Sequence, residues 1–478
     1  MESGIKWLLL CAALALGEAA GFWLSRFAEL WPLPFFAWAL ASLIGYGLGL
    51  RGWYLVSVFL LGFSLALLTA QMRSRVLEGV SGHGSAVMLR LSVDEDARWN
   101  GVSKWASFPS RIGSVKLTAV FPRTASPELP RAGEVWLCRG WVERLDEDGI
   151  SQRRRFWIVG SDVCMKKVSE NHSPIAGWVY GLRRECSRRM GIGLESRPLS
   201  AALNRAILLG ERGRLERRVK RAFADAGTIH IFAISGFHVM LVAGAIRLAL
   251  TVFLVPLRFH GVVLVPVLWF YVLMTGANPS AVRAAMMASL YFMAPLVWCR
   301  PDSVVSWAQT FLAMHISDPS KLHDIGSCLS FSVMLAVVLA GRFTARFISR
   351  RWVSAAVMTL AAWCAGTPIA AFAFGRFVPA GIFSNLLLVP AAAVGVPIAM
   401  TGVLVSFVSR RLAAYVNNFA ALVTEAMAGF SEVVAGIPCA SYEVAPWPLW
   451  MCAVWYAAMG LLLWWLTRVM SSRRSSVC

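Results

Sequence analysis

Three polar side chains lie close together at the start of a long apolar run, where they could do chemistry. The stretch "HIFAISGFHV" (residues 230–239) places His230, Ser235 and His238 in otherwise hydrophobic sequence. A continuous helix would put all three on one face, and polar side chains at membrane depth usually face the protein interior or a water-filled cavity. Gly236 would permit close helix packing or a local break of the helix.

Four kinds of chemistry compete for this stretch. A metal site needs further ligands, and no H-x-H or H-E-x-x-H arrangement occurs among the histidines, so we expect no metal and no cofactor. A hydrolase built on Ser235 and His238 would need an oxyanion hole and an orienting acid, which the stretch does not supply. Hydrogen bonding between helices and the polar wall of a transport path are the interpretations left open.

Two more polar groups interrupt apolar sequence further along the chain. In residues 274–289, Asn278 and a proline break the run, Ser280 can cap a new helix, and Arg283 falls in its first turns. The arginine either snorkels to the membrane interface or forms a cation beside a helix N-terminus that attracts anions. Asp324 stands before another span, where it can be a helix N-cap.

These residues must be positioned by membrane-spanning helices. Of 478 residues, 58% are hydrophobic, and they form repeated long runs, which predicts a polytopic α-helical membrane protein with about 10–12 transmembrane helices. Candidate spans lie near residues 5–24, 33–50, 53–71, 230–254, 261–276, 281–299, 303–317, 325–341, 352–374, 382–408, 412–435 and 447–467.

Positive charge predicts the orientation of these spans. With the N-terminus inside, the cytoplasmic ends would carry Lys6, Arg51, Arg258, Arg300, Arg342, Arg346, Arg350, Arg351, Arg410, Arg411, Arg468, Arg473 and Arg474. The opposite short loops would carry only Arg26, Lys321 and Arg376. Both termini are therefore predicted inside, and the long segment 72–229 outside. The net charge of +20 favours a polyanionic partner, an anionic lipid surface, or both.

Residues 72–200 read as a small β domain rather than as spans. Alternating β-branched and aromatic runs, separated by Gly, Pro, Asn and Asp, predict an antiparallel barrel or sandwich. Cys138 and Cys164 would form a disulfide in an oxidising compartment, while two separate buried thiols fit the sequence equally well.

A basic segment follows the β domain. Its apolar residues Leu215, Val219, Ala222, Phe223 and Ala226 have helical spacing, and Arg and Lys residues occupy the other side. This pattern predicts an amphipathic helix over 201–227, resting on lipid headgroups, contacting phosphates, or doing both.

Together these motifs resemble the ComEC family of bacterial competence proteins. The stretches "LLGERGRL" and "FADAGTIHIFAISGFHVMLVAG" match the family's pattern, with Phe237 in place of its usual leucine. The stretches "TGANPSAVRAAMM", "DIGSCLSFSVMLAVV" and "GTPIAAFAFGRFVPAGIFSNLLLVPAAA" follow in the family's order, and the last contains Asn385. Ser327 and Cys328 replace the family's usual Phe-Gln.

The resemblance implies a multi-pass inner-membrane channel that passes single-stranded DNA into the cytoplasm during transformation. Implied partners are single-stranded DNA, the lipid bilayer and other competence proteins: a DNA receptor, a cytoplasmic helicase and a separate nuclease. Many family members continue into a metallo-β-lactamase-like domain. The sequence ends at Cys478 without one, so we expect no enzymatic activity.

The resemblance also implies an organisation and a set of sites. The expected parts are N-terminal helices (1–71), an external OB-like β domain (72–200), the basic helix (201–227), the channel domain (228–470) and a cytoplasmic tail (471–478). The expected channel lining is His230, Ser235, Gly236, His238, Asn278, Ser280, Arg283, Asp324 and Asn385. The expected DNA contacts are Arg153, Arg154, Arg155, Arg212, Arg214, Arg217 and Arg218.

Two further expectations concern the residues that stack on bases and the alternative function. Aromatic platforms for bases would come from Trp99, Trp105, Trp136, Trp141 and Trp157, at least half of which we expect in the core. The alternative function is a transporter of another anionic solute, or an envelope protein that retains the fold.

Overall fold

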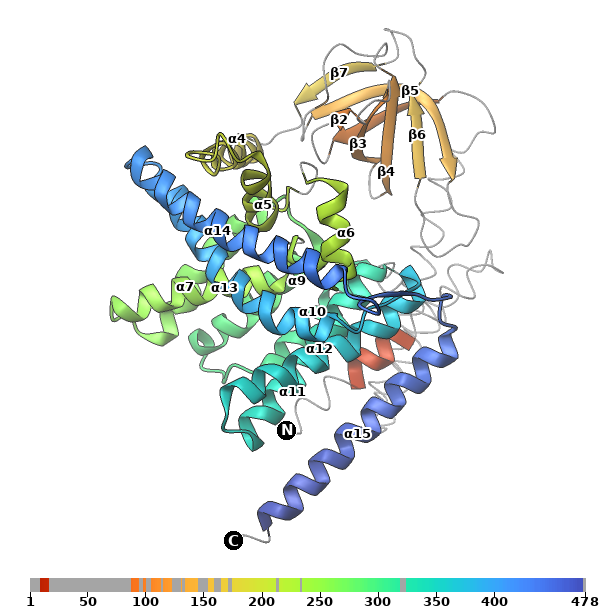
Figure 1. Ribbon diagram of the computed structural model, residues 1–478, viewed down its shortest axis with the longest axis vertical. Helices are drawn as coiled ribbons and strands as arrows, with labels where there is room; N and C mark the ends of the chain where they lie inside the picture. The colour runs from red at the N-terminus through yellow and green to blue at the C-terminus, as the bar shows by residue number, and fades with distance from the viewer. Residues whose placement is uncertain are drawn as a thin grey trace, which may run out of the picture. The chain divides into compact units, whose positions relative to one another are not determined.

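The computed structural model describes most of the chain from Pro174 onward and the strands before it. The described residues are 9–16, 87–93, 98–99, 105–112, 115–122, 130, 134–144, 154–158, 165–170, 174–211, 215–232, 234–318 and 324–475. They form two compact units, one of strands up to Glu185 and one of helices from Cys186 onward (Figure 1). Residues 9–16 are helical and belong to the helical unit, where the Cys11 thiol lies 3.5 Å from the Ala308 carbonyl oxygen.

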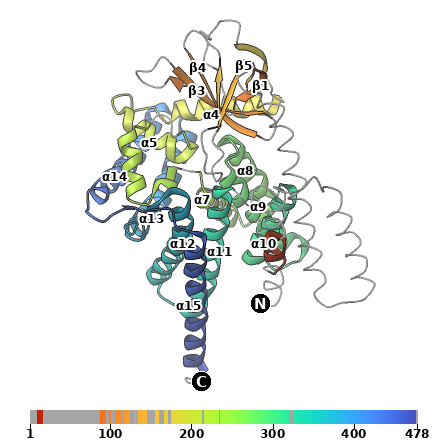
Figure 2. The same cartoon turned by 90° about the vertical axis from the view of Figure 1, so that its right-hand side faces the viewer.

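The predicted spans from residue 261 onward each coincide with one helix. These are α8 (His260–Met274), α9 (Pro279–Met293), α10 (Ser303–Ser317), α11 (Ile325–Phe347), α12 (Arg351–Phe374), α13 (Gly381–Val405), α14 (Arg410–Ala435) and α15 (Leu449–Ser475). Helix α12 packs against both α11 and α15 (Figure 2). The candidates at 33–50 and 53–71 lie outside the described residues.

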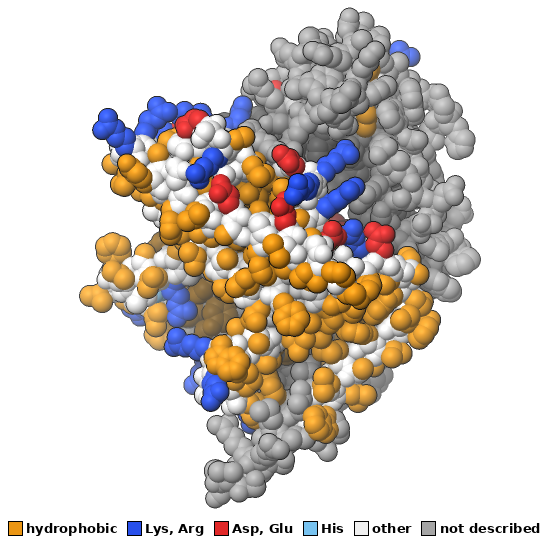
Figure 3. Space-filling model, in the orientation of Figure 1, with side chains coloured by type: hydrophobic (Ala, Val, Ile, Leu, Met, Phe, Trp, Pro, Cys, Tyr) orange, Lys and Arg blue, Asp and Glu red, His pale blue; other side chains and the backbone are white. Residues whose placement is uncertain are grey.

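The chain is a multi-pass membrane protein. Within the described part, five helical stretches are long and apolar enough to cross a bilayer: Leu257–Met274, Pro279–Val297, Ile325–Phe347, Arg351–Phe374 and Gly381–Val405. Hydrophobic side chains cover a broad band of the visible face, and most Lys and Arg side chains lie outside that band (Figure 3). This distribution is the one that a hydrocarbon layer imposes on a protein surface.

The continuous helix predicted over 201–227 is wrong. Helix α5 (Pro198–Leu209) ends where Gly210 adopts a left-handed conformation, with φ of 72°, and α6 (Arg217–Asp225) begins separately. Glycine takes this conformation without steric cost and commonly terminates helices. Helix α5 was not among the predicted spans because it has only 12 residues, yet nearly all of its side chains are buried.

The amphipathic pattern of α6 is correct, but protein covers its apolar face. Leu215, Val219, Ala222, Phe223 and Ala226 are all buried. Helix α6 packs against α14, and the Phe223 ring lies 4.4 Å from that of Phe232. The apolar face therefore stabilises the helical unit instead of resting on lipid headgroups.

The stretch 230–239 is not one helix either. Residues Ile229–Phe232 form a short 3-10 helix, η2, and α7 (Gly236–Val252) begins after Ser235, whose backbone is extended. Serine is a favoured N-cap residue, because its side chain competes with the backbone for hydrogen bonds. The single polar face predicted for His230, Ser235 and His238 therefore does not exist.

Small residues bring the ends of helices α7, α8 and α9 together. Ile234, Val239, Leu264 and Leu268 form a buried cluster with four alanines of α9, at positions 281, 284, 285 and 288. Alanine side chains allow close approach of helices whose surroundings are apolar, where close packing drives association. This cluster fixes the start of α7 against the first turns of α9.

Polar side chains of α14 hold the segment that leads into the helical unit. Asn417 donates to the carbonyl oxygens of Arg189 and Ile192, both at 3.0 Å. Further contacts are Asn418 with the Gly193 carbonyl, Thr424 with Asn204, Glu425 with Ser200, and Glu432 with Arg218. The described residues from Arg189 to Arg218 thus contact α14 from its first half, at Asn417, to its last turns, at Glu432.

The strand unit is a sheet that closes on itself. It contains β1 (Val87–Val93), β2 (Arg98–Trp99), β3 (Trp105–Ile112), β4 (Val115–Pro122), β5 (Glu134–Arg144), β6 (Arg154–Ile158) and β7 (Met165–Glu170), followed by α4 (Pro174–Arg189). Strand β1 pairs with β3 and with β5, so the order β1-β3-β4-β6-β5 returns to β1. The β4–β6 pair is parallel and the others are antiparallel. Leu91, Ala119, Phe121 and Ile158 are buried inside.

Gly227 provides a direct test of the packing between the end of α6 and the start of α13. Its φ is +75°, and a Cβ there would lie 2.8 Å from the Gly381 Cα. We expect Gly227→Ala to lower the free energy of unfolding by at least about 2 kcal/mol, from left-handed strain and overpacking. Thermal unfolding of the detergent-solubilised protein measures this loss.

Gly244→Ala in α7 is the matched control, because nothing lies within 4 Å of the added carbon. It should leave the unfolding temperature equal or slightly higher. Equal behaviour of the two variants would contradict the close contact at Gly227.

Candidate functional site

Ser235 and His238 interact at the start of α7. The His238 Nδ1 lies 3.3 Å from the Ser235 Oγ, and the Ser235 backbone N–H donates to it at 3.4 Å. Since Nδ1 accepts this bond, the proton of the neutral ring is on Nε2. The ring is fully buried, and Nε2 has no hydrogen-bond partner among the described residues. The Ile207 carbonyl is close enough to interact with the ring, but it does not complete a hydrogen bond.

His230 differs from His238 in its surroundings. It lies on η2, before the break, and part of its surface is exposed although many protein atoms surround its ring. The two imidazoles are near enough for their charges to interact if both were protonated. Of the three polar residues in the opening stretch, Ser235 and His238 therefore form one group and His230 stands beside it.

Gly236 brings the start of α7 against helices α9 and α11. A Cβ at Gly236 would lie 3.3 Å from the Ala284 Cβ of α9 and 2.9 Å from the Met334 Cε of α11. Because no side chain separates them, α7 touches both neighbours directly. Gly236 is thus a packing residue in this structure and exposes no polar group.

Arg283 crosses from α9 to the start of α11. Its Nη2 donates to the Gly326 carbonyl oxygen at 3.0 Å, its guanidinium carbon lies 5.8 Å from the Phe331 ring centroid, and its charge interacts with Asp324. The side chain is only 3% exposed, so it does not snorkel to the interface. Its Nε has no partner among the described residues.

Asp324 is the N-cap that the sequence predicts. Its Oδ2 accepts the Ser327 backbone N–H at 3.0 Å, while the Ser327 hydroxyl is buried and has no partner within the described part of the chain. The cap satisfies one of the open backbone donors at the start of α11. Ser327 was noted only as a departure from the family pattern, and its buried hydroxyl has no sequence signal.

Three predicted residues are not joined to this group by any described contact. Asn278 caps α9 through its backbone carbonyl, which accepts the Val282 N–H at 3.0 Å, and Ser280 is half-buried in the first turn. The Asn385 Oδ1 is buried in α13 without a partner among the described residues. Beside it, the hydroxyl of fully buried Ser384 also has no partner there.

The predicted DNA-contacting arginines fall into different settings. Arg217 is exposed on α6, and Arg218 pairs with Glu432 at 3.4 Å. Arg154 and Arg155 belong to β6, paired in register with Arg144 and with Glu143 of β5. Arg153, Arg212 and Arg214 lie outside the described residues, as does Cys164, so the disulfide with buried Cys138 stays a prediction.

An ion pair that the sequence did not reveal anchors the end of α6. Asp225 accepts a bond from Arg376 at 3.0 Å, and Arg376 also lies 3.8 Å from Glu443. Arg376 is in the short strand β8 (Arg376–Phe377), which pairs with β9 (Tyr442–Glu443). These residues are far apart in sequence, so no local pattern could predict the contact.

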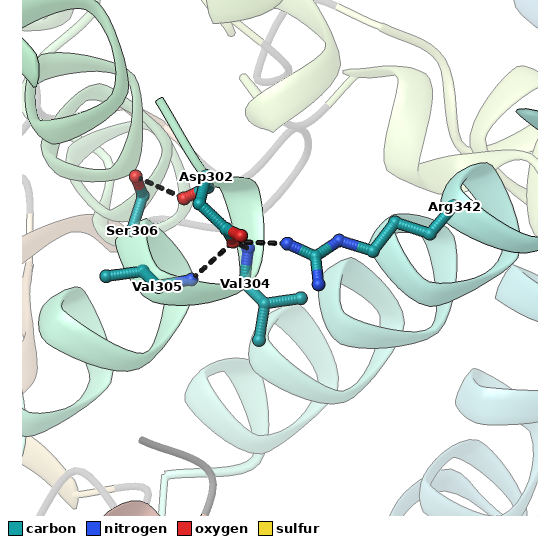
Figure 4. Close-up of polar contacts among 5 residues, drawn as sticks. All are labelled: Asp302, Val304, Val305, Ser306 and Arg342. Atoms are coloured by element: carbon teal, nitrogen blue, oxygen red, sulfur yellow. Dashed lines mark hydrogen bonds and ion pairs between the residues drawn. The ribbon is translucent and has the colours of Figure 1, made fainter. Parts of the chain in front are cut away.

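Another ion pair joins α10 to the far end of α11. Asp302 caps α10 by accepting the N–H groups of Val304 and Val305, and Arg342 donates to the same carboxylate (Figure 4). Partial burial alone would raise the pKa of Asp302, but these hydrogen bonds and the charge of Arg342 together hold it below its ordinary value.

Comparison with known proteins identifies the family. The model of the "Competence protein" family matches residues 207–469, more than half of the chain. The chain belongs to the competence protein family. The resemblance to ComEC-type competence proteins is thereby confirmed, and the matched range contains every residue of the predicted channel lining.

Three similar proteins illustrate the relationship. ComE operon protein 3 of Bacillus subtilis (strain 168) is 30% identical over 198 residues, which is 40% of this chain and 25% of that protein. Competence protein ComA of Neisseria gonorrhoeae is 30% identical over 29% of this chain and 21% of its own length. An uncharacterized protein of Aquifex aeolicus (strain VF5) is 33% identical over 29% of this chain and 33% of its own length.

The matched segments thus cover a third or less of each relative's length. No solved structure matches the chain. The strand unit lies before the matched range of the competence family.

Arg283→Met tests the bridge between α9 and α11. The variant keeps the side-chain bulk but leaves the Gly326 carbonyl without its donor, so we expect a loss of about 1–3 kcal/mol in the free energy of unfolding. Thermal unfolding in detergent measures it, with Arg247→Met, an exposed position on α7, as control. Equal unfolding temperatures for the two variants would show that the bridge contributes nothing.

Asp302→Ala should reduce stability by about 1–2 kcal/mol, because the helix cap is lost, whereas Arg342→Gln should cost at most about 1 kcal/mol. The lowered pKa means that the stabilisation is present above the ordinary pKa of 3.8 and is lost as the pH falls through the folded value. Unfolding measured between pH 7 and pH 3 should show wild type and Asp302→Ala converging at the acid end. A constant difference would rule out the ionised cap.

Proposed function

We propose that this chain is an inner-membrane channel through which single-stranded DNA enters the cytoplasm during natural transformation. The observation that carries the proposal is the match to the competence family over the whole region that holds the polar residues. One of the similar proteins, ComA of Neisseria gonorrhoeae, is named a competence protein. In this proposal the chain transports DNA without cleaving it.

The basic helix α6 supports attraction of a polyanion. Its apolar face is buried against the helical unit, so Arg217 and Arg221 are held outward and exposed. The ion pairs of Arg218 with Glu432 and of Asp225 with Arg376 fix both ends of the helix. A fixed row of exposed cations lowers the entropy that is lost when phosphates bind.

The strand unit supports a second contact with the strand of DNA. A closed order with one parallel pair, β4–β6, fits the five-stranded Greek-key barrel of OB folds, which bind single strands. Trp141 pairs in register with Trp157 across β5 and β6. Trp136, by contrast, is in the core and donates to Glu134 at 2.9 Å, so it is not a platform for bases.

The polar group at the starts of α7, α9 and α11 supports a passage that opens and closes. His238 and Arg283 are both buried where these helices meet, and each keeps one nitrogen without a partner among the described residues. Separation of the three helices would expose both nitrogens to water and to phosphate. In this proposal the passage opens when DNA and the partner proteins separate these helices.

The decisive experiment follows labelled duplex DNA in a deletion strain of the source organism. We expect DNA to bind the cell surface normally but to remain sensitive to added nuclease, because the strand no longer reaches the cytoplasm. Restoring the gene should restore protection. Normal entry in the deletion strain of a competent organism would refute the channel and favour transport of another anionic solute.

A second measurement tests the role of α6. In the full-length protein, Arg217→Gln/Arg221→Gln should weaken binding of single-stranded DNA and reduce the slope of log K against log salt by about 0.7 for each phosphate contact removed. Arg350→Gln/Arg351→Gln, at the turn between α11 and α12, is the matched control and should leave the slope unchanged. An unchanged slope in both variants would remove α6 from the binding surface.

A further inference from the structure

The segment between β7 and α7 carries no sequence that could cross a bilayer alone. Helix α4 has five charged residues among its last seven, at positions 183–189. Helix α5 is the longest apolar helix of the segment, but its 12 residues span only about 18 Å, against about 30 Å of hydrocarbon. Residues 189–227 are therefore expected to stay on one side of the membrane.

This segment contacts the turn between α13 and α14. Arg189 donates through Nη1 to the Ser406 carbonyl oxygen at 2.7 Å, and its guanidinium lies 3.8 Å from the Phe407 ring centroid. A Cβ at Gly193 would lie 2.5 Å from the Ala414 Cβ, and the charge of Glu195 interacts with that of Arg410. The end of α13 and the start of α14 are thus beside residues 189–195.

The same segment also contacts the opposite ends of both helices. Gly227 touches Gly381, the first residue of α13, and Arg218 pairs with Glu432 near the end of α14. A segment that stays on one side thus contacts both ends of both helices. Two helices with both ends on one side lie along the membrane rather than across it.

The exposed face of α14 is mostly apolar, as a helix that lies along the membrane requires. Apart from Arg410 and Arg411 in the first turn and Glu432 near the end, the exposed residues of the helix carry no charge and follow helical spacing: Leu412, Tyr415, Phe419, Leu422, Ala426, Gly429 and Val433. The polar side chains of the helix face residues 189–218 instead. An apolar stripe opposite a polar face is typical of helices at the bilayer interface.

We propose that the α13–α14 hairpin lies along the membrane surface on the side of residues 189–227, with the apolar stripe of α14 inserted into the lipid interface. Helix α13 is long and apolar enough to cross, but both of its ends lie beside residues 189–227, at Gly381 and at Ser406. Arg410 and Arg411 then face the lipid headgroups on the side of α6. This revises the sequence prediction, which placed both arginines opposite residues 72–229. The inference does not depend on DNA transport.

Cysteine accessibility tests the side of the turn. In the full-length protein with Cys164, Cys299, Cys439 and Cys478 replaced by serine, single cysteines are introduced as Val408→Cys, Arg217→Cys and Arg350→Cys. Each of these positions is exposed. A membrane-impermeant maleimide is applied to intact spheroplasts and to inverted membrane vesicles.

We expect Val408→Cys and Arg217→Cys to react in one preparation and Arg350→Cys in the other. Reaction of Val408→Cys together with Arg350→Cys would overturn the proposal, because the hairpin would then cross the membrane while residues 193–217 cross inside the protein.

Depth measurements provide a check that is independent of side. Spin labels at positions 412, 422 and 433 in bilayers report relative access to oxygen and to a nickel chelate. For a helix along the surface, all three labels should have the same shallow depth. A clear maximum of depth at position 422 would mean that α14 spans the bilayer, and it would overturn the proposal.

Discussion

One constraint organises the helical unit: polar groups that lie away from water must find partners inside the protein. The breaks between helices are where this demand is greatest, because helix ends leave backbone donors and acceptors open. The side chains of His238, Asp302 and Asp324 meet the demand locally at three helix starts, where each accepts a backbone N–H. Asn417 meets it at long range, since one amide satisfies the carbonyls of Arg189 and Ile192.

The sequence predicts the apolar helices well because their length and composition are local properties. The helices from residue 260 to 475 begin within a few residues of the predicted spans, although α11 and α15 end six or more residues beyond them. The prediction from the sequence fails at Gly210 and at Ser235, where one residue ends or starts a helix inside an apparently continuous pattern. The pattern also indicates an apolar face on α6 without saying what covers it, since α14 lies about two hundred residues away in sequence.

In the candidate site, too, the sequence predicts some features and misses others. Ser235, His238, Arg283 and Asp324 are recognisable from residue type and position, and the structure brings them to the starts of α7, α9 and α11. The partner of Arg283, the Gly326 carbonyl, is a backbone atom, and residue types do not encode it. Likewise, the buried hydroxyls of Ser327 and Ser384 stand out only once their burial is known.

The contact between Gly227 and Gly381 has a mechanical consequence. With no side chain between them, the two backbones touch, so the chain after α6 cannot slide past the start of α13. The ion pair of Asp225 with Arg376 resists separation at nearly the same point. A pull on α6 would therefore be transmitted directly to the start of α13 and to β8.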